Sequence, residues 1–89
     1  MRKYKVRLHF AEPDDVLPGE RLFSVRLQGQ EALATLDVVK EAGGKQRSLV
    51  KEFAGIQVDD DLLIELRPDK SAKVQAALLC GVELLAVGW

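Results

Sequence analysis

The chain has very few of the side chains on which enzymes most often depend. It contains one histidine, His9, and one cysteine, Cys80, among its 89 residues. A lone histidine builds neither a catalytic triad nor a zinc site, and no serine or cysteine stands in a signature context. The carboxylates fall in predicted turns, where nothing indicates the tuned acid–base pair that glycoside hydrolysis requires. We therefore predict that the chain is not an enzyme.

A single cysteine also excludes an internal disulfide. Cys80 lies in an apolar run, and free cysteines are among the most buried residue types, so we predict a buried core thiol. Metal ligands are scarce as well, because the acidic run Asp59–Asp61 lacks the spaced ligands and following glutamate of an EF-hand loop. We expect neither a metal ion nor a cofactor.

The sequence shows no excess of positive charge and no long hydrophobic run. Thirteen basic residues are interleaved with fourteen acidic ones, for a net charge of −1, whereas a nucleic-acid surface needs clustered cations. The longest apolar stretch, residues 76–87, contains Glu83 and is too short to span a bilayer. No apolar segment typical of a signal peptide follows Met1. We expect no nucleic-acid partner, no membrane insertion and no signal peptide.

What the sequence does contain is apolar residues at every second position, the pattern of strands with one buried face. The first strand is predicted over residues 4–10, with Tyr4, Val6, Leu8 and Phe10 on one face and Lys5, Arg7 and His9 on the other. A loop is predicted at 13–19, and then a hairpin with strands at 22–27 and 32–35. Asp37 is predicted to cap one or two helical turns that Gly43 ends in a left-handed conformation.

The second half of the chain continues this pattern. Strands are predicted at 47–53, 56–58 and 62–66. Residues 74–87 are apolar on both faces, which predicts one long strand, or two with a bend at Gly81, covered on both sides. Short strands between regular turns favour a single all-β domain over residues 1–89, an antiparallel β-sandwich or barrel.

Several segments, taken in order, resemble malectin and malectin-like domains. Residues 4–12, YKVRLHFAE, closely resemble the family's YxVxLxFAE strand, and residues 21–29, RLFSVRLQG, its RxFxVxLxG hairpin. Residues 36–43, LDVVKEAG, are similar to its (F/L)DI-x-x-x-AG segment. The KEF stretch, the strand at 62–66 and LCGVEL at 79–84 extend the resemblance over nearly the whole chain. The sequence FAEPDD at residues 10–15 most resembles that of modules appended to bacterial glycoside hydrolases.

The resemblance implies a jelly-roll-like sandwich that binds glucose-containing oligosaccharides without cleaving them, in an extracytoplasmic setting. The candidate carbohydrate-binding residues are Glu12, Asp14, Asp15 and Asp69, of which Asp69 best matches a family acidic ligand residue. Two departures stand out. A full family domain is longer, and its portion before the YxVxLxFAE strand has no counterpart here. The loop after Glu12 also lacks the aromatic residues that sugar-binding members carry.

A partial sandwich exposes an apolar sheet face that another layer must cover, and large exposed patches usually mark interfaces. The alternative hypothesis is therefore a structural module that binds no sugar. It would form a homo-oligomer or pack on other domains of a parent protein. Under that hypothesis a partner buries Leu62, Ile64, Leu66, Val82 and Leu84. The aromatic residues Tyr4, Phe10, Phe23 and Phe53 are predicted to pack in the core. Trp89 is either a loose end or a cover for a sheet edge or partner.

Overall fold

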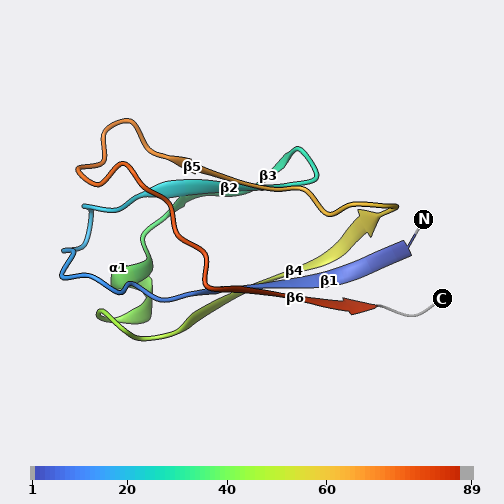
Figure 1. Cartoon of the computed structure of the whole chain (residues 1–89), viewed down its shortest axis with the longest axis horizontal. Coiled ribbons are helices and arrows are strands. Elements are labelled where there is room, and N and C mark those ends of the chain that lie inside the picture. The colour runs from blue at the N-terminus through green and yellow to red at the C-terminus, as the bar shows by residue number, and fades with distance from the viewer. Residues whose placement is uncertain (1, 87–89) are drawn as a thin grey trace.

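The computed structural model describes residues 2–86, which form six strands and one short helix. In chain order the elements are β1 (Arg2–Phe10), β2 (Phe23–Leu27), β3 (Gln30–Leu36), α1 (Val38–Ala42), β4 (Leu49–Val58), β5 (Ile64–Pro68) and β6 (Gly81–Ala86). The strands make two antiparallel sheets, ordered β4-β1-β6 and β3-β2-β5. Figure 1 shows one sheet above the other, with α1 at one end. The predicted antiparallel β-sandwich is confirmed.

The two middle strands, β1 and β2, form the centre of the core. Six of their inward side chains are almost completely buried, namely Val6, Leu8, Phe10, Phe23, Val25 and Leu27, whereas Tyr4, at the start of β1, is only partly buried. The rings of Phe10 and Phe23 meet across the sheets with centroids 5.9 Å apart and planes inclined by 50°, a tilted geometry that aromatic pairs favour. The predicted alternation is thus confirmed, because successive side chains of a strand point to opposite faces.

β4 is one strand where the sequence predicted two, and a bulge divides it. Ala54 and Gly55 lie opposite the single β1 residue Lys5, and Gly55 has a φ of +70°, which glycine adopts without steric cost. Phe53 and Ile56, on either side of the bulge, both pack against the core. The extra residue therefore keeps two apolar side chains inward although they stand three positions apart.

The helix α1 forms where the sequence predicts it. Asp37 has an extended backbone, and its Oδ1 accepts a hydrogen bond from the N–H of Lys40 at 3.3 Å. Gly43 ends the helix in the left-handed region, at φ +83°. Val38 and Val39 are buried, so this short helix covers the end of the sandwich.

The stretch before the last strand departs most from prediction. Residues 74–80 form no strand and cross from one sheet to the other (Figure 1), and β6 begins only at Gly81. Cys80, predicted to be buried, is exposed. All residues of β6 after Gly81 are exposed, so the prediction of a strand covered on both faces is wrong. β6 is an edge strand that pairs with β1 alone among the described strands.

The predicted apolar contact face is also revised. Leu62, Ile64 and Leu66 are partly buried and pack against the chain's own core. For Ile64 and Leu66 the reason is that β5 pairs with β2, opposite Leu27 and Val25, which turns these side chains inward. Val82 and Leu84 remain exposed. Val87 and Trp89 lie outside the described residues, so the predictions for them are not addressed by the structure.

Candidate functional site

Most of the predicted site residues gather at one end of the sandwich, on the left in Figure 1. We term it the loop end; it comprises residues 11–22, 37–46 and 69–80. Backbone hydrogen bonds join these segments. The N–H of Asp69 donates to the carbonyl of Leu22 at 2.8 Å, and the N–H of Val74 donates to the carbonyl of Glu20 at 2.9 Å. The loops are therefore tied to one another.

A buried ion pair lies at the centre of the loop end. Arg21 Nε donates to Glu12 Oε1 at 2.6 Å, and the two residues are only 8% and 1% exposed. The same guanidinium donates through Nη1 to the carbonyl of Ala76 at 2.9 Å and through Nη2 to Asp14 Oδ2 at 3.2 Å. The fixed fork of donors on arginine suits such a role. One side chain thus connects the first loop to the segment that leads into β6.

Glu12 was predicted to contact a sugar, but its carboxylate is directed into the protein. Oε1 accepts from Arg21, and Oε2 accepts from the N–H of Asp14 at 3.3 Å. A buried carboxylate is tolerated only when it is paired and hydrogen-bonded. Glu12 therefore stabilises the conformation of the loop from inside the protein. Sequence reasoning missed Arg21, although it is the only basic residue among residues 11–22 and hence the only cation that this loop itself supplies.

Asp14 and Asp15 are displayed to solvent, with side chains that are 67% and 85% exposed. Asp14 is held by Arg21, and Asp15 forms an ion pair with Lys45. Beside them lies a hollow of about 380 Å³, lined by Asp15, Val16, Leu17, Pro18, Val39, Lys40, Gly43, Gly44 and Lys45. The hollow combines aliphatic walls with charged groups at its rim.

Asp69 stands in the loop after β5. Its Oδ1 accepts from the hydroxyl of Ser71 at 2.7 Å and from the N–H of Ser71 at 2.9 Å. These two hydrogen bonds, the hydroxyl first, hold the pKa of the Asp69 carboxyl below its ordinary value. The carboxylate is therefore ionised at neutral pH. The backbone N–H of Asp69 is hydrogen-bonded to Leu22, and the side chain of Asp14 is hydrogen-bonded to Arg21. Because Arg21 and Leu22 are neighbours in the sequence, both predicted acids lie at the same end of the sandwich.

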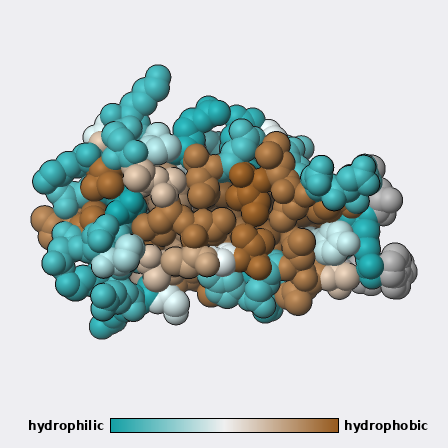
Figure 2. Space-filling model, viewed as in Figure 1, coloured by the Kyte–Doolittle hydropathy of each residue, from teal (hydrophilic) through white to brown (hydrophobic). Residues whose placement is uncertain are grey.

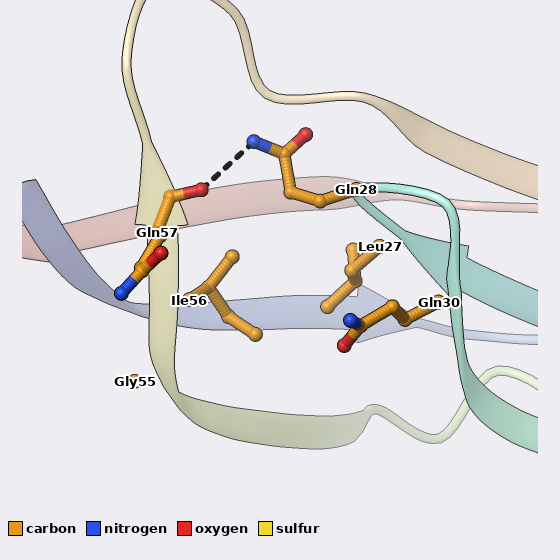
Figure 3. A pocket seen from close by; sticks show the side chains of 6 residues that line it. All are labelled: Leu27, Gln28, Gln30, Gly55, Ile56 and Gln57. Carbon is orange, nitrogen blue, oxygen red and sulfur yellow. Dashed lines mark hydrogen bonds between the residues drawn. The ribbon is translucent and has the colours of Figure 1, made fainter. Parts of the chain in front are cut away.

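A second cavity, of about 390 Å³, lies at the opposite end of the sandwich (Figure 3). Leu27 and Ile56 face one another from the two sheets. The Gln28 amide Nε2 donates to the carbonyls of Gln57 at 3.0 Å and Asp61 at 3.1 Å, which ties the β2–β3 turn to the end of β4. No residue predicted for the site lines this cavity.

Within residues 2–86, no three His, Cys, Asp or Glu side chains gather where they could hold a metal ion. No helix of this part of the chain has the length and apolar character needed to cross a membrane. The loop end thus offers carboxylates, amines and an aliphatic hollow, which are groups suited to hydrogen bonding and apolar contact with a ligand.

Comparisons with known proteins agree with this architecture. The probable receptor-like protein kinase At1g30570 of Arabidopsis thaliana is 33% identical over 84 residues, which cover 91% of this chain and 10% of the relative. Receptor-like protein 4 of the same plant is 39% identical over 69 residues, covering 75% of this chain and 11% of that protein. The chain therefore spans about a tenth of the length of these curated relatives.

Solved structures show the same fold. A structure of the plant peptide RALF23 in complex with FER and LLG2 matches with a TM-score of 0.84 and 26% identity, covering 96% of this chain and 24% of that one. The ANX2 ectodomain from Arabidopsis thaliana matches with a TM-score of 0.82 and 19% identity, covering 99% of this chain and 26% of the other. Each match covers about a quarter of the solved chain.

The curated relatives are receptor-like proteins of a plant, and they give no support to the prediction, made from the sequence FAEPDD, of a module appended to a bacterial glycoside hydrolase. The malectin domain family itself matches residues 2–80, from the first residue of β1 to the residue before β6. The chain therefore belongs to the malectin domain family, a family of non-catalytic binding modules.

Proposed function

We propose that this chain is a carbohydrate-binding module that binds glucose-containing oligosaccharides at the loop end without cleaving them. The observation that carries the assignment is the buried Glu12–Arg21 pair, which holds the exposed carboxylate of Asp14 next in sequence to Asp15, a residue that lines the hollow. A site whose groups are already fixed loses less entropy when a ligand binds. Family membership supports a binding role, and the geometry supports this place for it.

The chemistry of the loop end suits a saccharide. Sugar hydroxyls donate to carboxylates, which Asp14, Asp15 and Asp69 supply, and accept from the ammonium of Lys45. Leu17 and its aliphatic neighbours give the C–H face of a pyranose an apolar wall. Because no aromatic side chain lines the hollow, we expect weak binding, with a Kd on the order of 1 mM, or about −4 kcal/mol.

The curated relatives support an extracytoplasmic setting. They are a receptor-like protein kinase and a receptor-like protein, so we propose that this module acts outside the cytoplasm. Because the chain spans about a tenth of its curated relatives, we also propose that it works beside other domains of a receptor-like protein. A titration with maltose oligosaccharides, followed by backbone NMR shifts, tests the binding proposal directly.

The shifts are expected at residues 14–18, 39–45 and 69–71. Asp14→Asn and Asp15→Asn should each weaken binding about two- to tenfold, since an exposed hydrogen bond contributes about 0.5–1.5 kcal/mol. Asp60→Asn is the matched control, because Asp60 is an exposed acid in the turn after β4. Shifts confined to the cavity at the opposite end, or no shifts with any glucose oligosaccharide, would refute the proposal.

A second function, self-assembly, is favoured by a separate observation. Val82 and Leu84 are 41% and 47% exposed although they lie opposite Leu8 and Val6, both of which are completely buried. Large apolar side chains exposed on an inner sheet face indicate a surface that a partner covers. We propose that the chain forms a homo-oligomer through this surface. Light scattering, which measures the mass in solution, distinguishes the two functions. A monomer that binds saccharide supports carbohydrate binding and not self-assembly.

A further inference from the structure

We propose that β6 pairs in antiparallel fashion with β6 of a second copy of this chain, with Leu84 on the twofold axis. This inference rests on the proposed self-assembly, and it names the strand and the register. It does not depend on saccharide binding at the loop end.

The position of β6 in its sheet is the first support. β6 is hydrogen-bonded to β1 on one side, and no other described strand pairs with its second side. Residues directly opposite in an antiparallel pair point to the same face. The side chains of Val82 and Leu84 therefore point to the inner face, where the partner side chains of β1 are buried. Figure 2 shows apolar surface along the middle of this side of the molecule.

The composition of β6 is the second support. Natural edge strands usually carry lysine, proline or a bulge that prevents pairing with another chain. β6, GVELLA, has none of these. The opposite edge of the same sheet is protected, because β4 contains Lys51 and the bulge at Gly55. Among the two edges of this sheet, β6 is thus the one open to strand addition.

The sequence of β6 also fits a second copy of itself. With a twofold axis perpendicular to the sheet, the inner faces of both copies lie on the same side only if even-numbered residues face even-numbered ones and odd-numbered residues face odd-numbered ones. With Leu84 opposite Leu84 of the second copy, Val82 faces Ala86 and Glu83 faces Leu85. Every inward position then meets an apolar side chain. Glu83 meets no acid, and it keeps its own contact with His9 Nε2 at 2.5 Å.

Two neighbouring registers preserve the faces. The one centred on Leu85 is distinguished by the cross-linking experiment below. The one centred on Glu83 is unfavourable, because it places Glu83 directly opposite Glu83 of the second copy, and like charges in direct opposition destabilise a sheet. The charge on Glu83 therefore selects the Leu84 register over this alternative. The product is a six-stranded sheet in which β6 is no longer an edge.

The first experiment measures solution mass by multi-angle light scattering over a range of chain concentrations. The wild-type chain should have the mass of a dimer, and Leu84→Lys should halve it, because two lysines then face each other on the axis. Val50→Lys is the matched control. Val50 is also 47% exposed but lies on β4 at the other edge of the sheet, so this variant should remain dimeric. Circular dichroism confirms that each variant is folded.

The second experiment tests the register by cysteine cross-linking, with Cys80→Ser as background because Cys80 is exposed. Cα atoms in direct opposition are about 4.5–5.5 Å apart, within the disulfide range of about 4.4–6.8 Å. Leu84→Cys should therefore cross-link under mild oxidation. Two Leu85→Cys chains should not, since the two-residue offset, about 6.8 Å along the strand, puts their Cα atoms beyond disulfide reach.

The outcomes separate the claims. A monomer at every concentration overturns both self-assembly and this pairing. A dimer that persists in Leu84→Lys, or one that cross-links equally at positions 84 and 85, overturns the β6 pairing while self-assembly stands. A dimer that dissociates only in Leu84→Lys and cross-links only at position 84 supports the inference.

Discussion

The ion pair between Glu12 and Arg21 should dominate the response of the loop end to mutation. Arg21→Met removes the cation and leaves the Glu12 carboxylate, 1% exposed, without a countercharge. Breaking a buried pair in this way costs about 3–5 kcal/mol. A domain of 89 residues has an unfolding free energy of about 4–13 kcal/mol, at about 0.05–0.15 kcal/mol per residue. The single change therefore removes a large share of the total stability.

The double variant Glu12→Leu/Arg21→Met gives the sharper result. It removes both charges, so no ion stays buried alone, and replacement of a buried pair by apolar groups is often close to neutral. What remains lost is the hydrogen bonding of Arg21 to Ala76 and Asp14, about 1 kcal/mol for each bond. We expect the double variant to be about 1–3 kcal/mol more stable than Arg21→Met alone, with strongly non-additive effects.

Urea denaturation followed by circular dichroism measures these differences, provided that the slope of free energy against urea is unchanged. Glu12→Leu alone should cost less than Arg21→Met, because Arg21 keeps its contact with Asp14. The reasoning fails if the double variant loses the sum of the two single losses. That result would mean that the two side chains stabilise the fold independently.

Two further predictions concern carboxylates at the same end. The pKa of Asp69 is lowered in the folded chain. Its charge therefore stabilises the fold fully at pH values above the ordinary aspartate pKa of about 3.9. This contribution to stability is lost as the pH falls through the lowered pKa. The Tm advantage of wild type over Asp69→Asn should thus shrink on acidification below about pH 4; an advantage unchanged at pH 2 contradicts this. Asp37→Ala should cost about 1 kcal/mol for the lost cap and about 1 kcal/mol for the bond from Gly19. Thermal unfolding measures this loss, and one no larger than that of Glu31→Ala, at an exposed position of β3, refutes it.

Features set by neighbouring residues could be predicted from the sequence. The alternation at Val6, Leu8 and Phe10 depends only on the two-residue period of a strand, and all three are buried. The helix between Asp37 and Gly43 depends on local capping. The order of motifs resembling malectin domains added the family, which the match over residues 2–80 then showed.

Features set by distant contacts could not be predicted in this way. Cys80 and Leu84 lie in an apolar run that favours burial, yet both are exposed. Cys80 lies just before β6, and Leu84 lies on β6, which is an edge strand among the described strands. Glu12 is a polar loop residue by sequence and a buried one in the fold, because Arg21 neutralises it. Both outcomes depend on which segments meet across the sandwich, and residue type alone does not show this.

The sheet order β4-β1-β6 also has a consequence for the way the chain folds. β2 and β3 are joined by a tight turn and can pair early, but β1 pairs only with strands that are far away in the sequence. Closing such long loops costs entropy before any contact rewards it, and pairing of this kind is slow. We therefore expect Val6, Leu8 and Phe10 to gain their sheet partners only after the β2–β3 hairpin has formed. During that interval a strand whose side chains form the core of the folded domain is open to association with other chains.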